Sequence, residues 1–138
     1  ILAMRRKDRM IEQIDDLAGL SKSNPLMALA LLIFMFSMAG IPPLAGFFGK
    51  LYVFLAAIES GLVGLAVIGV LASVVGAFYY IRIVKVMYFD EAAEPFDRPV
   101  GRELMVVLAV TAIFTMFLFA YPAPLLAGAE AAAASLFR

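Results

Sequence analysis

The fold of this chain is decided by the stretch Gly40-Ile41-Pro42-Pro43-Leu44-Ala45-Gly46-Phe47-Phe48-Gly49-Lys50. This stretch lies inside an apolar run that extends from Leu26 to Ile58. As one helix the run would be about 50 Å long, whereas the hydrocarbon core of a bilayer is only about 30 Å thick. One straight membrane helix therefore does not account for its length.

An interruption at Gly40–Pro43 accounts for the excess. The two prolines have no N–H to donate to a helix, and the glycines at 40 and 46 loosen the backbone on either side. We therefore predict two half-helices, near residues 26–39 and 44–58, that together form one broken membrane helix. The carbonyl groups of Met38 and Ala39 are expected to lose their helical partners at the break.

The composition indicates an integral membrane protein. The chain is 64% hydrophobic, compared with about 45–50% in ordinary soluble domains. Its formal net charge of zero argues against nucleic-acid binding, which requires a basic face. It contains no His and no Cys, the usual ligands of zinc, haem and iron–sulfur clusters, and it has no G-x-G-x-x-G or phosphate-binding loop. We expect no cofactor in this chain, so that any redox cofactor lies in other chains.

Three membrane-spanning helices are expected, which makes the fold class all-α. The spans are 25–59 with the break, 61–88 and 103–122, and Glu59-Ser60-Gly61 forms the turn between the first two. The remaining segments are the end of a preceding helix plus a cytoplasmic loop at 1–24, a second cytoplasmic loop at 89–102 and an outer-face tail at 123–138. For residues 5–24, a short interfacial helix and an ordinary loop are both open, and the alanine-rich tail is expected to form a short interfacial helix.

The distribution of positive charge predicts the orientation. Basic residues precede the first span and flank the second loop, whereas the opposite side carries only Arg138. The residues on the basic side are Arg5, Arg6, Lys7, Arg9, Lys22, Arg82, Lys85, Arg98 and Arg102. Because the basic side of a membrane protein is cytoplasmic, the C-terminus is expected to face outward.

The first residues favour a chain that continues a larger protein. Apolar Ile1–Met4 precedes Arg5-Arg6-Lys7, the reverse of the order in a signal peptide. We interpret Ile1–Met4 as the end of an earlier membrane helix, and the chain as the C-terminal part of a larger subunit. A small protein with a trimmed end is the alternative.

Lys50 is the candidate functional residue. An ionisable side chain at membrane depth is costly and indicates a functional site, and a broken helix beside it is typical of ion carriers. Lys50 lies about 13 Å from the outer end of its helix, which exceeds the reach of a snorkelling side chain. We therefore predict a proton relay residue supported by Gly40, Pro42, Pro43 and Gly46, with water at the freed carbonyls. A snorkelling or packing lysine is the alternative.

Three stretches resemble a known family. They are Ile14-Asp15-Asp16-Leu17-Ala18-Gly19-Leu20, Ser37 to Tyr52 with its G-I-P-P-x-x-G-F-x-x-K pattern, and Phe78-Tyr79-Tyr80-Ile81-Arg82. Together they are similar to the antiporter-like membrane subunits of bacterial NADH:quinone oxidoreductase, respiratory complex I. The first stretch favours subunit N over subunits L and M, and the lysine at 50 favours N over M, which usually has Glu at this position.

The resemblance implies a fold and a function. The family has fourteen transmembrane helices, so this chain would supply the last three, with Lys50 on the broken twelfth helix and facing the outer half-channel. Such subunits pump protons along a central axis of lysines and glutamates in the bacterial cytoplasmic membrane. NADH, FMN, iron–sulfur clusters and quinone (ubiquinone in an aerobic bacterium) belong to other subunits. The implied partners are the other membrane subunits, above all a neighbouring antiporter-like subunit, and the lipid bilayer.

Two other functions stay open. One is a subunit of a multi-subunit sodium/proton antiporter, which has no redox partners. The other is a purely structural membrane subunit that packs against neighbouring helices through Gly69 and Ser73, because small residues four positions apart let membrane helices approach closely.

Overall fold

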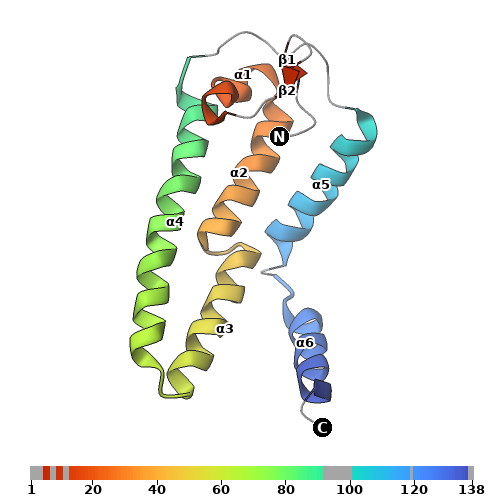
Figure 1. Ribbon diagram of the computed structural model, residues 1–138. Helices are drawn as coiled ribbons and strands as arrows, with labels where there is room; N and C mark the ends of the chain where they lie inside the picture. Colours follow the sequence, from red (N-terminus) through yellow and green to blue (C-terminus); the bar gives the residue numbers. More distant parts are fainter. Residues whose placement is uncertain (1–4, 7–8, 11–12, 92–100, 119, 137–138) are drawn as a thin grey trace.

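The computed structural model describes residues 5–6, 9–10, 13–91, 101–118 and 120–136 (Figure 1). The elements in chain order are β1 (Arg5–Arg6), β2 (Arg9–Met10), the 3-10 helix η1 (Ile14–Leu17), α1 (Leu20–Ser23), α2 (Pro25–Ala39), α3 (Ala45–Glu59), α4 (Val63–Phe89), α5 (Arg102–Phe117) and α6 (Ala123–Leu136). The all-helical architecture is confirmed. The only departure within these residues is the antiparallel pair of two-residue strands, with Arg5 opposite Met10.

Helix α2 lies between α4 and α5, α3 follows it along the chain, and α4 returns antiparallel beside both α2 and α3 (Figure 1). Helix α5 packs against α2, and α6 continues away from α5 toward the end where α3 meets α4. The short helix α1, the end of α4 and the start of α5 therefore lie at one end of the molecule. Lys22, Lys85 and Arg102 belong to these segments, so basic residues gather at the end opposite Glu59.

Gly40, rather than the prolines, ends α2. It adopts φ = 85°, a left-handed conformation that favours glycine. Its N–H donates to the carbonyl oxygen of Ser37 at 3.0 Å, and the Ile41 N–H donates to that of Phe36 at 3.0 Å. This pattern is a Schellman motif, which satisfies carbonyls at a helix end. The prolines follow it, joined by a cis peptide bond, and lie outside both helices.

The same motif ends α3 at its C-terminal end. Gly61 has φ = 76°, its N–H donates to the Ile58 carbonyl at 2.9 Å, and the Leu62 N–H donates to the Ala57 carbonyl at 2.8 Å. The chain then reverses directly into α4. Gly40 thus determines the direction in which the chain leaves α2 toward α3, and Gly61 determines the direction in which it leaves α3 toward α4.

The buried core lies at the basic end. It joins η1 and α1 to α2 and the end of α4, and its members are Leu17, Leu20, Met27, Ala28, Leu31, Met35, Val84 and Met87. The Gly19 N–H also donates to the Val86 carbonyl at 3.4 Å. The segment before α2 therefore contains two short helices, η1 and α1, and is packed into the fold by Leu17 and Leu20. The interpretation of Ile1–Met4 lies outside the described residues.

One helix among the described residues, α4, is long and apolar enough to cross a membrane by itself. Helix α2 and helix α6 are shorter apolar helices. Within the last predicted span, 103–122, helix α5 ends at Phe117, and α6 begins after the span, at Ala123. Most large apolar side chains of α3, α4 and α5 are exposed, which is the surface expected of helices that face lipid or other membrane helices.

Candidate functional site

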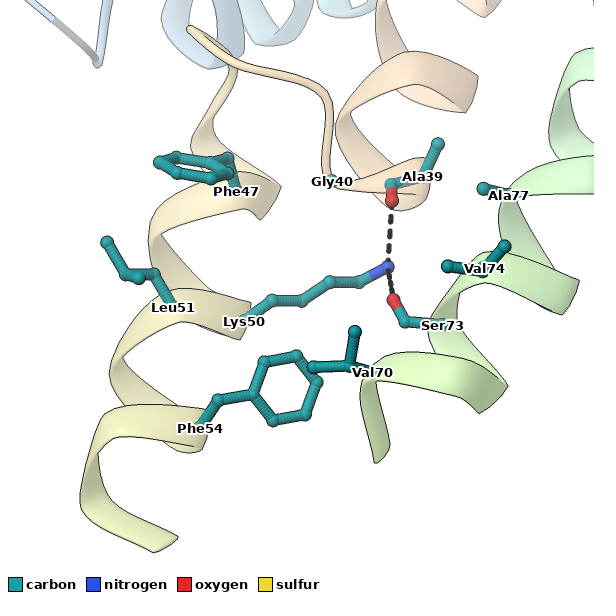
Figure 2. A pocket seen from close by; sticks show the side chains of 10 residues that line it. All are labelled: Ala39, Gly40, Phe47, Lys50, Leu51, Phe54, Val70, Ser73, Val74 and Ala77. Atoms are coloured by element: carbon teal, nitrogen blue, oxygen red, sulfur yellow. Dashed lines mark hydrogen bonds between the residues drawn. The ribbon is translucent and has the colours of Figure 1, made fainter. Parts of the chain in front are cut away.

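Lys50 extends from α3 across to α2 and α4 (Figure 2). Its Nζ donates to the carbonyl oxygen of Ala39 at 3.0 Å and to the Ser73 Oγ at 2.6 Å. The first acceptor is the end of α2, and the second lies in the middle of α4. The ammonium group therefore joins both halves of the broken helix to the next helix, and the side chain does not run along α3 toward Glu59 as a snorkelling lysine would.

The site is a pocket of about 230 Å³ with a mostly apolar wall (Figure 2). Lys50 and Ser73 are the two polar side chains among the ten described residues that line it. The other lining residues are Ala39, Gly40, Phe47, Leu51, Phe54, Val70, Val74 and Ala77. A charged amine in such surroundings depends on its hydrogen-bond partners, because burial without them is costly.

The break itself supplies one of these partners. The Ala39 carbonyl is one of the two that we expected to lose a helical partner, and the Lys50 Nζ donates to it. A carbonyl at the C-terminal end of a helix carries the negative end of the helix dipole and favours a cation. The broken helix thus creates the acceptor that holds the lysine.

Ser37 and Gly46 hold α3 against α2. The Gly46 N–H, in the first turn of α3, donates to the buried Ser37 Oγ at 3.0 Å. A Cβ at position 46 would overlap with the Ser37 carbonyl oxygen and lie 2.7 Å from its carbon. Gly46 is therefore required for a close backbone approach, whereas the sequence suggested only a loosened backbone.

Gly40 leaves room for the lysine. A Cβ there would lie 2.9 Å from Lys50 Cδ and 3.4 Å from Nζ. We expect Gly40→Ala to destabilise the protein by about 1–2 kcal/mol through left-handed strain. By displacing Lys50, it is also expected to lower the proton uptake that the sequence predicts for this residue. Gly61→Ala is the matched control, because Gly61 has the same conformation and nothing within 4 Å of an added Cβ. Thermal unfolding and proton uptake of both variants check this, and equal uptake in the two would contradict the contact with Lys50.

The structure brings together part of the predicted site. Lys50 and Gly40 line the pocket, and Gly46 lies at the start of α3, the helix that carries Lys50. Pro42 and Pro43 are exposed and do not line the pocket. From the sequence, Ser73 was expected only to pack against neighbouring helices, and no role at the site was predicted for Ser37. The sequence did contain one signal for a role of Ser73 at the site, namely a serine in the membrane helix that follows the helix with the lysine.

A second, larger pocket of about 880 Å³ lies between α3, α5 and α6. Tyr52 and Glu130 are the polar side chains among the residues that line it, and Lys50 is not one of them. No group of three His, Cys, Asp or Glu side chains that could hold a metal ion occurs in the described part of the chain. We therefore place the candidate site at Lys50.

Comparison with known proteins identifies the relatives. The family described as "NADH:quinone oxidoreductase/Mrp antiporter, TM" matches residues 1–76. NADH-quinone oxidoreductase subunit N of Parvibaculum lavamentivorans is 62% identical over 99% of this chain and 28% of the relative. The protein of the same name from Azorhizobium caulinodans is 66% identical over 99% of this chain and 29% of the relative. The chain thus spans less than a third of the length of these curated relatives.

A solved structure agrees with these sequences. A chain of respiratory complex I from Thermus thermophilus with bound aureothin matches with a TM-score of 0.74 and 32% identity, over 84% of this chain and 26% of that chain. The resemblance to subunit N that the sequence motifs indicated is therefore confirmed. The chain belongs to the NADH:quinone oxidoreductase/Mrp antiporter family of transmembrane proteins.

Proposed function

We propose that this chain is the C-terminal part of a proton-translocating, antiporter-like subunit in the membrane arm of bacterial NADH:quinone oxidoreductase. The names of its relatives support this assignment. The observation that carries it is the ammonium group of Lys50, held in an apolar pocket by the end of a broken helix and by Ser73. In this proposal Lys50 accepts a proton from the polar axis of the full subunit and releases it toward the outer face.

The chain would contribute to the enzyme as a translocase and not as a redox catalyst. NADH, FMN, the iron–sulfur clusters and quinone would be bound by other subunits. Its partners would be the other membrane subunits, in particular a neighbouring antiporter-like subunit, and the lipid of the bacterial cytoplasmic membrane. The chain would cross that membrane three times, through α2 with α3, through α4 and through α5 with its continuation, and its basic end would be cytoplasmic.

Purification through a tag on the full-length subunit tests the assignment. We expect peripheral redox subunits to co-purify and membrane vesicles to take up protons when NADH reduces quinone. The family description also names an antiporter, and for that function the redox subunits would be absent while a sodium gradient alone drove proton movement. That second result would overturn the proposal.

A further inference from the structure

The two acceptors of Lys50 differ in what they are able to do. The Ala39 carbonyl oxygen only accepts hydrogen bonds, whereas the Ser73 hydroxyl both accepts and donates. Both lie within hydrogen-bond distance of the same nitrogen, at 3.0 and 2.6 Å. Ser73 is therefore the partner whose role is free to change with the charge of the lysine.

A lysine ammonium carries three N–H groups and no lone pair. Two of them are held by Ala39 and Ser73, so the third is the proton available for exchange with a water molecule entering the pocket. When that proton leaves to form hydronium, the electron pair of the broken N–H bond remains on Nζ as a lone pair. The neutral amine then needs one donor and one acceptor in addition to the Ala39 carbonyl.

The lining of the pocket offers no other side chain for this purpose. Apart from Lys50 and Ser73, the described lining residues carry alkyl or phenyl side chains or none. The nitrogen is also confined, since Gly40 lies against the end of the lysine side chain and Phe54 and Val70 lie beside it (Figure 2). A lone pair left without a donor there would oppose loss of the proton.

We infer that Ser73 is a positioning residue for Lys50. Its hydroxyl accepts from the ammonium. After loss of the proton, the amine rotates about its Cε–Nζ bond and the hydroxyl rotates about Cβ–Oγ, so that Ser73 donates to the lone pair while the second N–H of the amine faces the entering water. Lys50 then exchanges its proton without moving its heavy atoms out of the pocket. This inference rests on the proposed function of Lys50 as a proton relay.

The test compares Ser73→Thr with Ser73→Val in the full-length subunit of the assembled complex. Threonine and valine have the same shape and differ in the hydroxyl, so the packing effects of the added volume cancel. We expect Ser73→Thr to retain proton uptake and Ser73→Val to lower its rate roughly ten- to a hundredfold, the effect of one hydrogen bond to a charged group. The apparent KM for NADH should be unchanged in both. Equal rates in the two variants, at any level, overturn the inference.

A second comparison covers the case in which the larger side chains prevent assembly. Ser73→Ala removes the hydroxyl without adding volume, and it should lose proton uptake, whereas full uptake would overturn the inference. Thr111→Val is the matched control, because the Thr111 hydroxyl on α5 donates to the carbonyls of Val107 and Leu108 in its own helix. This variant should behave as the parent.

Vesicles prepared in the same way from the Lys50→Met variant serve as the reference. If Lys50→Met pumps normally, the proposed relay fails and Ser73 has no proton to position. If Lys50→Met loses pumping while Ser73→Thr and Ser73→Val have equal rates of proton uptake, the proposed relay at Lys50 stands and only the role of Ser73 is overturned.

Discussion

Replacing Lys50 by methionine in the full-length subunit is expected to abolish proton transfer through this site while the complex stays assembled. Methionine has a similar length but no proton to exchange, and loss of a positioned acid–base group typically slows a proton transfer about 10²- to 10⁴-fold. The Ala39 carbonyl and the Ser73 hydroxyl lose their donor, which costs about 1–3 kcal/mol of stability. NADH-driven quinone reduction and proton uptake, recorded on one vesicle preparation after a native gel, measure both effects.

Two further variants separate charge from proton exchange. Lys50→Arg keeps the positive charge and the donors, but an arginine does not release its proton, so we expect it to fail as methionine does. Lys85→Met is the control, because Lys85 lies near the end of α4 with a 64% exposed side chain and pairs with Asp90 at 2.7 Å. If assembled Lys50→Met took up protons normally for each NADH, Lys50 would be a packing residue and the outward path would lie elsewhere.

Adding a single methyl group at Gly46 is expected to prevent normal assembly. In Gly46→Ala the new Cβ would occupy the space of the Ser37 carbonyl, which belongs to the backbone of α2 and has no rotamer to escape into. Helix α3 would have to move away, which breaks the bond from the Gly46 N–H to Ser37. Overpacking of this kind costs about 1–3 kcal/mol or more, and the displaced α3 would also carry Lys50 away from Ala39.

Gly49→Ala is the matched control for Gly46→Ala. Gly49 lies one turn further along α3, and an added Cβ there meets nothing within 4 Å. Because alanine favours helix over glycine by about 1 kcal/mol, Gly49→Ala should be neutral or stabilising within this chain. The yield of complex on native gels and its thermal inactivation distinguish the two variants. Normal assembly of Gly46→Ala would show that the contact between α2 and α3 is looser than the structure has it.

Sequence reasoning located the break in the first membrane helix because the responsible chemistry is local. A glycine followed by two prolines ends a helix wherever it occurs. The prolines were expected to leave the carbonyls of Met38 and Ala39 without helical donors, and the Ala39 carbonyl accepts from Lys50. The sequence did not indicate that Gly40 caps α2 before the prolines begin, through hydrogen bonds to the carbonyls of Phe36 and Ser37.

The partners of Lys50 could not be predicted, because they depend on the register between helices. Ser73 lies 23 positions after Lys50, and its place opposite the lysine depends on how Gly61 directs the turn. The Gly69 and Ser73 spacing correctly indicated a close helix contact, since a Cβ at Gly69 would lie 2.7 Å from Phe54 of α3. The Ala39 carbonyl carries no side-chain signal at all, so only the fold reveals it as an acceptor.

Helix α3 has no buried side chain within this chain, and this determines what fixes its rotation about its own axis. Lipid tails are as apolar as leucine, so apolar contacts alone give a membrane helix little preference for one face over another. The polar groups at Gly46 and Lys50 are directional, and a shift by one residue would turn Lys50 by about 100°, out of reach of both acceptors. The proton-carrying residue would thus also set the alignment of the helix that bears it.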